Sequence, residues 1–148
     1  MSYQERRTVV SLISTLVLAV IYFVWALRNY PGGNPYTPEV FHFWGASMFI
    51  VTPLNIALQI AISIVFSVGY ATATREKESS VTDERDRLIE LRGIRNTLFT
   101  FAFGFLLAMG SLVLNLSPSV MFIIIFAFGF ISGIVGYVSQ LFYYRRGF

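Results

Sequence analysis

Most of the residues that could recognise a partner or do chemistry are gathered in one short stretch of this chain. Of its 19 charged residues, 12 lie between Arg75 and Arg95, six of them basic and six acidic. Charges paired at this density favour specific recognition of another charged surface over raw affinity. The same stretch carries no net charge and so lacks the positive field that nucleic acid requires. We therefore expect a protein partner and no direct contact with nucleic acid.

The sharpest pattern in this stretch begins at Thr82, a residue type that caps helices. Acidic residues follow, which suit the positive end of a helix dipole. Leucine and isoleucine then recur every three or four residues, so a short amphipathic helix is predicted over 83–95, with Gly93 placed to let it bend. The candidate partner contacts are its charged residues: Asp83, Glu84, Arg85, Asp86, Arg87, Glu90 and Arg92. The alternative is a solvated helix whose apolar stripe packs on lipid headgroups or on the underside of the bundle.

The run Asp83-Glu84-Arg85-Asp86 is followed by Ile89 and Arg92 and then by a pair of apolar segments. This pattern resembles a family of small uncharacterised prokaryotic membrane proteins. Members of that family have four spans and share an Asp-Glu-Arg-acid motif between the second and the third. They have no established activity and are often encoded beside a small helix-turn-helix regulator. The resemblance rests on residues 82–95 and on the hydropathy pattern, and it implies a membrane protein linked to a regulator.

A second set of polar residues lies within an apolar segment. Asn55, Gln59, Ser63 and Ser67 are spaced by four, so they share one face of a helix. Asparagine and glutamine need partners in hydrocarbon, because an unsatisfied amide costs several kcal/mol there. One interpretation of this polar stripe is hydrogen bonding between helices. The other is a lining for a solute or a lipid headgroup, which Pro53 favours because it frees a backbone carbonyl.

Catalytic and metal-binding groups are not expected. His42 and Glu39 lie three residues apart, but catalytic zinc typically takes three protein ligands, and the chain has no cysteine. The sequence contains no glycine-rich phosphate loop after a strand and no serine, histidine and aspartate arrangement. We therefore predict a protein that is not an enzyme, with no catalytic residue, no cofactor and no metal ion.

The elements that position these residues are long apolar helices. Residues 8–27, 40–74 and 96–144 contain no Lys, Arg, Asp or Glu and make up 104 of the 148 residues. A soluble domain of this size cannot bury so much apolar chain. Since a membrane helix takes about 20 residues, we predict an all-α integral membrane protein. It forms a single transmembrane domain, 1–148, that includes a charged cytoplasmic segment, 71–96. The four transmembrane helices are expected at about 8–28, 45–70, 97–115 and 119–142.

The distribution of basic residues predicts the orientation in the membrane. With four spans, both termini and the charged segment share one side, and ten of the eleven Lys and Arg residues lie there. The positive-inside rule makes that side cytoplasmic, in a cytoplasmic (inner) membrane. The bilayer is therefore the first partner, and a cytoplasmic protein and a second copy of the chain are further candidates.

Small residues recur four apart in the last two predicted spans, a spacing that lets membrane helices approach closely. These candidate packing residues are Gly104, Ala108, Gly129, Ser132, Gly133 and Gly136. Packing of the third span on the fourth within one chain is one interpretation, and a seam between two copies is the other.

Two functions remain open on these grounds. The first is a membrane-bound regulator or sensor that contacts a cytoplasmic partner through the helix at 83–95. The second is a small transporter, a channel or a lipid-binding oligomer that uses the polar stripe. Apart from Arg28 at the end of the first, the predicted spans contain no Asp, Glu, Lys or Arg, which argues against a coupled pump.

Overall fold

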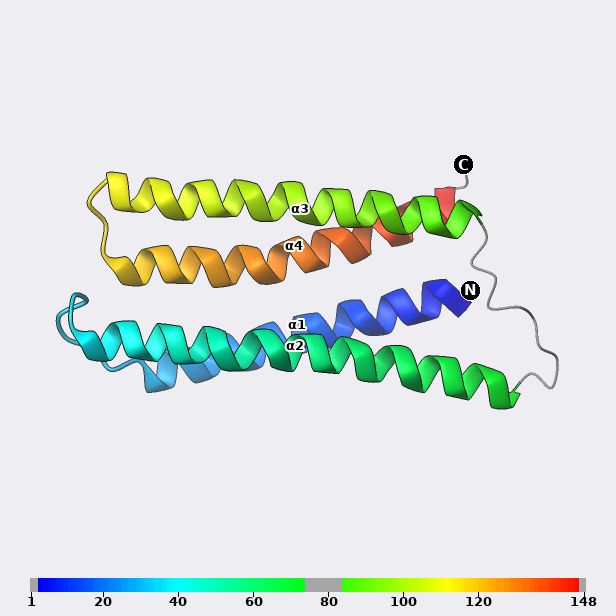
Figure 1. Ribbon diagram of the computed structural model, residues 1–148, viewed down its shortest axis with the longest axis horizontal. Coiled ribbons are helices and arrows are strands. Elements are labelled where there is room, and N and C mark those ends of the chain that lie inside the picture. The colour runs from blue at the N-terminus through cyan, green and yellow to red at the C-terminus, as the bar shows by residue number, and fades with distance from the viewer. Residues whose placement is uncertain (1–2, 74–83, 147–148) are drawn as a thin grey trace.

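The computed structural model describes residues 3–73 and 84–146, which form four long helices and no strand. The helices are α1 (Tyr3–Asn29), α2 (Pro38–Ala73), α3 (Glu84–Val113) and α4 (Pro118–Arg146) (Figure 1). All four are long and apolar enough to cross a membrane. The prediction of an all-helical chain with four potential spans is therefore confirmed.

The helices run side by side, and both chain termini lie at the same end of the bundle (Figure 1). We call this end the terminal end, and the opposite end, with the connections 30–37 and 114–117, the loop end. Helix α3 packs closely on α4, α4 also packs on α1, and α1 packs on α2. Helix α2 touches α4 only slightly and makes no close backbone contact with α3. The bundle is therefore open between α2 and α3.

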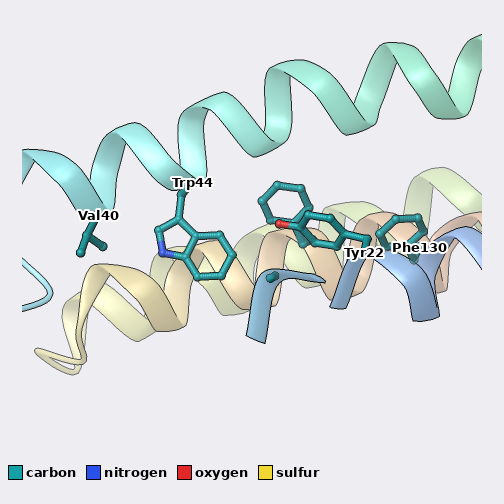
Figure 2. Close-up of a cluster of buried hydrophobic side chains, with 6 residues drawn as sticks. Tyr22, Val40, Trp44 and Phe130 are labelled. Carbon is teal, nitrogen blue, oxygen red and sulfur yellow. The ribbon is translucent and has the colours of Figure 1, made fainter. Parts of the chain in front are cut away.

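Near the loop end, aromatic rings from three helices form the main core. Its buried side chains are Tyr22, Ala26, Val40, Trp44, Phe126 and Phe130, and we call this group the aromatic core (Figure 2). The rings of Tyr22 and Phe126 stack with centroids 4.6 Å apart. The Ser119 hydroxyl lies 2.9 Å from the Tyr30 hydroxyl and accepts a hydrogen bond of 3.3 Å from Trp44 Nε1. These contacts tie α1, α2 and α4 together.

The pairing of α3 with α4 depends on small residues. A Cβ atom at Gly93 would lie 2.6 Å from Cγ of Gln140, so only glycine allows this approach. Gly104 makes the same close approach to the ring of Phe128. The Asn96 amide donates a hydrogen bond of 2.9 Å to Ser139 Oγ across the same seam. Close packing of this kind replaces the hydrophobic drive that membrane helices lack.

The helices differ from the predicted spans at their ends. The amphipathic helix runs directly into the third span, as its position before that span predicts, and both belong to α3; Gly93, expected to allow a bend, packs closely on Gln140. Helix α2 begins at Pro38 rather than at residue 45, because proline suits the first helical turn. It then continues through Pro53. The predicted start of the amphipathic helix at residue 83 and residues 74–83 of the charged segment 71–96 lie outside the described residues.

Large apolar side chains cover the outside of the bundle. Leu27 and Phe49 are each 82% exposed, and many other aliphatic and aromatic side chains are more than half exposed. A surface of this kind is unfavourable in water but matches the hydrocarbon of a bilayer. The exposed faces therefore agree with helices that cross a membrane.

Candidate functional site

At the terminal end the four helices enclose a cavity of about 240 Å³, and every side chain that lines it is polar. Helix α1 contributes Gln4, Arg7, Thr8 and Ser11 to this polar cavity. These residues are three or four apart and so share one face of α1. Thr8 Oγ1 donates to the Gln4 carbonyl oxygen at 2.9 Å, so the buried hydroxyl is satisfied within its own helix.

Helices α3 and α4 provide the opposite walls of the polar cavity. Asp86 and Glu90, one turn apart, line it from α3, and Tyr137, Gln140 and Tyr144 line it from α4. The close seam between α3 and α4 places these two faces beside each other. None of the four helices could form such a cavity alone, because each contributes one narrow polar stripe to an otherwise apolar surface.

The charges of the polar cavity are unequal. Two carboxylates, Asp86 and Glu90, face one guanidinium group, that of Arg7. The Tyr144 hydroxyl lies beside the Asp86 carboxylate and interacts with it. The local charge is therefore negative by one unit, and the remaining amides and hydroxyls can both donate and accept hydrogen bonds. Such a site suits a small solute with a positive charge.

The inner end of the polar cavity is closed by Gln59 of α2. Its Nε2 donates to Thr15 Oγ1 at 3.1 Å and lies 3.4 Å from Ser14 Oγ. Tyr137 of α4 interacts with the side chains of Ser11 and Thr15 from the other side. Beyond these residues, toward the loop end, lies the aromatic core.

The four residues of the predicted polar stripe have different surroundings. Gln59 bonds to α1, as the interpretation of hydrogen bonding between helices requires. Asn55 lines a separate, apolar hollow. Ser67 is exposed, and its Oγ donates to the carbonyl oxygen of Ser63 in the same helix at 2.8 Å. The stripe therefore does not form one continuous lining.

The candidate partner contacts divide into two groups. Asp86, which is half-buried, and Glu90, which is exposed, line the polar cavity, whereas the exposed residues Glu84, Arg85 and Arg87 do not line it. The guanidinium of Arg92 lies over the ring of Tyr143, 5.3 Å from its centroid, and Asp83 lies outside the described residues. The packing of α3 on α4 makes this division, because it buries one side of α3.

The apolar stripe of α3 does not pack on the bundle. Leu88 and Leu91 are each just over half exposed, and Ile94 and Leu98 are exposed as well. The buried residues in this part of α3 are Ile89, with none of its surface exposed, and Gly93. Packing of Leu88 and Leu91 on the underside of the bundle, one of the two expected arrangements, is therefore wrong.

The small residues also have different environments. Gly104, Ala108 and Gly136 are buried in α3 and α4, and a Cβ at Gly136 would clash with the Thr97 hydroxyl. Ser132 is buried and bonds to the Gly129 carbonyl oxygen, and Gly133 faces Thr15 of α1. Gly129 itself has no atom within 4 Å of a Cβ position. Packing within one chain therefore accounts for Gly104 and Gly136 but not for Gly129.

Sequence reasoning did not single out the residues that α1 and α4 contribute to the polar cavity. Polar residues at positions 4, 8 and 11 and at 137, 140 and 144 have helical spacing, which was the available signal. Among the described residues there is no group of three His, Cys, Asp or Glu side chains that could hold a metal ion.

No protein-family model, no curated protein and no solved structure matches this chain. The site is therefore interpreted from its own geometry.

Proposed function

We propose that this chain is a non-enzymatic sensor of the cytoplasmic membrane, with both termini and the polar cavity on the cytoplasmic side. The excess of Lys and Arg at that end supports this orientation. A small cationic solute binds in the cavity, and α3 passes its presence on to a cytoplasmic protein. This function also fits the link to a regulator that the resemblance implies.

One observation carries the proposal: the first turns of α3 have two functional faces. Asp86 and Glu90 line the polar cavity, and Glu84, Arg85 and Arg87 are exposed on the same turns. A solute that interacts with the first pair therefore acts on the element that presents the second set. Binding shifts a conformational equilibrium when the bound state has the better contacts.

The ligand class follows from charge and size. The carboxylates of Asp86 and Glu90 attract a cation, and the amides of Gln4 and Gln140 offer further hydrogen bonds. A volume of about 240 Å³ is below the 300–1,000 Å³ that is typical of pockets for larger ligands. A small organic ammonium compound meets both conditions.

A single label on α3 tests the proposal. The chain has no cysteine, so Leu91→Cys, at an exposed position, gives one site for a spin label. We expect the label to become less mobile as a series of small mono- and diamines is titrated into the protein in lipid nanodiscs. Glu90→Gln removes a carboxylate from the cavity, so the midpoint of this change should move roughly ten- to hundredfold higher.

Glu84→Gln is the matched control, because it makes the same charge change on the same helix at a residue that does not line the polar cavity. It should leave the midpoint unchanged. No change in mobility with any amine, or equal shifts for Glu84→Gln and Glu90→Gln, would contradict a ligand site in the polar cavity.

Transport, the second candidate function, has less support. A solute leaving the polar cavity toward the loop end would have to pass Gln59 and then the aromatic core, where Tyr22, Phe126 and Phe130 are buried. We therefore expect liposomes that contain the chain to show no amine flux above that of empty liposomes. Flux that falls on Gln59→Leu substitution would favour the transporter.

A further inference from the structure

The seam between α3 and α4 has a second side, which does not face the polar cavity. On α3, Glu90 lines the cavity, whereas Arg92 lies two positions further along, and residues two apart on a helix do not share a face. On α4, Tyr144 lines the cavity, whereas its neighbour Tyr143 packs under the Arg92 guanidinium. A carboxylate therefore lies on one side of the seam and a guanidinium on the other.

Two contacts between guanidinium groups and rings build a basic cluster on this second side. The guanidinium carbon of Arg92 lies 5.3 Å from the ring centroid of Tyr143, and that of Arg146 lies 4.9 Å from the ring centroid of Phe142. The two rings belong to neighbouring residues and meet edge to face, with centroids 5.8 Å apart. A guanidinium stacked on a ring presents a planar fork of N–H groups, which matches the oxygens of a phosphate. We call Arg92, Phe142, Tyr143 and Arg146 the basic cluster.

The basic cluster lies where the apolar part of α3 and α4 ends. Residues 96–144 contain no Lys, Arg, Asp or Glu, and Arg92 and Arg146 lie just outside that stretch. Phe142 and Arg146 are exposed. Aromatic and basic side chains at the end of a spanning helix lie at the level of the lipid headgroups. A lipid phosphate is therefore the anionic group nearest to this cluster.

An exposed apolar face runs from the basic cluster along α3 toward the loop end. Phe99 and Leu106 follow Arg92 at intervals of seven residues, which is close to two helical turns, so the three share one side of α3. Phe99 and Leu106 are exposed, and so is Phe103 between them. Such a surface matches acyl chains. The guanidinium groups and the apolar face together fit the two parts of a phospholipid, its phosphate and its acyl chains.

The charge of the terminal end favours a lipid with net negative charge. On the side that holds both termini, the sequence has ten Lys and Arg residues and seven Asp and Glu residues outside the spans. Two of those carboxylates, Asp86 and Glu90, line the polar cavity. Basic residues at a membrane surface each add to the preference for anionic lipid. A zwitterionic lipid fits less well, because its ammonium group is repelled by the guanidinium groups.

We propose that the basic cluster binds the phosphate group of an anionic phospholipid, whose acyl chains lie along the exposed face of α3. The guanidinium groups of Arg92 and Arg146 donate hydrogen bonds to the phosphate oxygens, and the rings of Tyr143 and Phe142 hold these groups in place. This inference does not depend on the sensor function, because the basic cluster and the polar cavity have no residue in common.

Fluorescence quenching by brominated lipids tests the proposal. The chain has no cysteine, so Phe99→Cys gives one site for a fluorescent label on the acyl-chain face. The labelled protein is placed in phosphatidylcholine vesicles that contain rising fractions of brominated phosphatidylglycerol or brominated phosphatidylcholine. We expect the relative association constant to be roughly three- to thirtyfold higher for phosphatidylglycerol. A label at Ile64→Cys, exposed on α2, should show less than a twofold preference.

Two neighbouring arginines provide matched variants in the Phe99→Cys background. Arg146→Gln removes the guanidinium over Phe142 and should lower the preference for phosphatidylglycerol roughly three- to fivefold. Arg145→Gln makes the same charge change at an exposed position one residue earlier, which points about 100° away around the helix. It should leave the preference nearly unchanged.

Three outcomes would overturn the proposal. Equal quenching by the two lipids at Phe99→Cys would mean that this face does not select anionic lipid. An unchanged preference in Arg146→Gln, or equal losses in Arg145→Gln and Arg146→Gln, would show diffuse attraction to the basic end instead of binding at the cluster. Disulfide crosslinks between copies of unlabelled Phe99→Cys would show that a second copy covers the apolar face.

Discussion

The polar cavity and the aromatic core are built by the same helices but have opposite properties. On α1, polar residues such as Thr8 and Ser11 at the terminal end give way to Tyr22 and Ala26 toward the loop end. On α4, Tyr137 and Gln140 lie at the terminal end, and Phe126 and Phe130 lie toward the loop end. One bundle therefore has packed rings at one end and a polar-lined cavity at the other.

The two regions differ in whether their side chains already fill the space between the helices. In the aromatic core, ring centroids lie 4.6 to 6.0 Å apart, so the rings fill the space between the helices. In the polar cavity, carboxylates and amides point into a shared space that water or a solute must fill. Stability is therefore expected to depend on the aromatic core and ligand response on the polar cavity.

The largest effect is expected for Phe126→Ala. Phe126 is 5% exposed and stacks on Tyr22, so its truncation leaves a cavity between α1 and α4. We expect a loss of roughly 3–5 kcal/mol in the free energy of unfolding, measured by denaturation in detergent micelles. Phe49→Ala is the control, because Phe49 is 82% exposed and should change little. Equal losses for both variants would mean that the buried ring of Phe126 stabilises the bundle no more than the exposed ring of Phe49.

An intermediate effect is expected at the seam between α3 and α4. Gly104→Leu forces a side chain into the ring of Phe128, and overpacking of this kind costs roughly 1–3 kcal/mol. Gly129→Leu projects into open space and should be tolerated, although both glycines belong to the small-residue pattern. Thermal unfolding of the two variants distinguishes them. A destabilised Gly129→Leu and an unchanged Gly104→Leu would reverse our assignment of the seam.

The smallest change in the free energy of unfolding is expected in the polar stripe, and its sign should differ between Gln59 and Asn55. Gln59→Leu loses the hydrogen bond to Thr15, a contact between membrane helices worth roughly 0.6–2 kcal/mol. Asn55→Leu removes an acceptor without a partner, so it should be neutral or stabilising in delipidated protein. Unfolding in detergent measures both. Destabilisation by Asn55→Leu in delipidated protein would show that the amide is already satisfied.

Much of the fold was predictable because membrane helices are recognised by length and composition. Apolar stretches without charges correspond to α1, α2 and the pair α3 and α4. Helix ends were less predictable, since charged and aromatic residues beyond the apolar stretch stay helical where they pack. The role of Gly93 was not predictable either, because its close contact with Gln140 depends on a distant residue.

The candidate site was predictable only in part. Asp86 and Glu90 were noticed as charges on a helix, and Gln59 as a polar residue in an apolar segment. That they line one cavity with Arg7 and Tyr144 could not be inferred, because these residues lie on different helices. A pattern along the chain reports which residues share a face, but it does not report which faces meet.

The class of protein, the number of helices and the expected orientation follow from hydrophobic length and from where the charges lie, so they can be derived from the amino-acid order. Which polar residues meet depends instead on how the helices pack. Helix α3 packs on α4 and leaves α2 aside. That arrangement gathers the polar stripes of α1, α3 and α4 around one cavity, and it leaves Asn55 at an apolar hollow between α2 and α4.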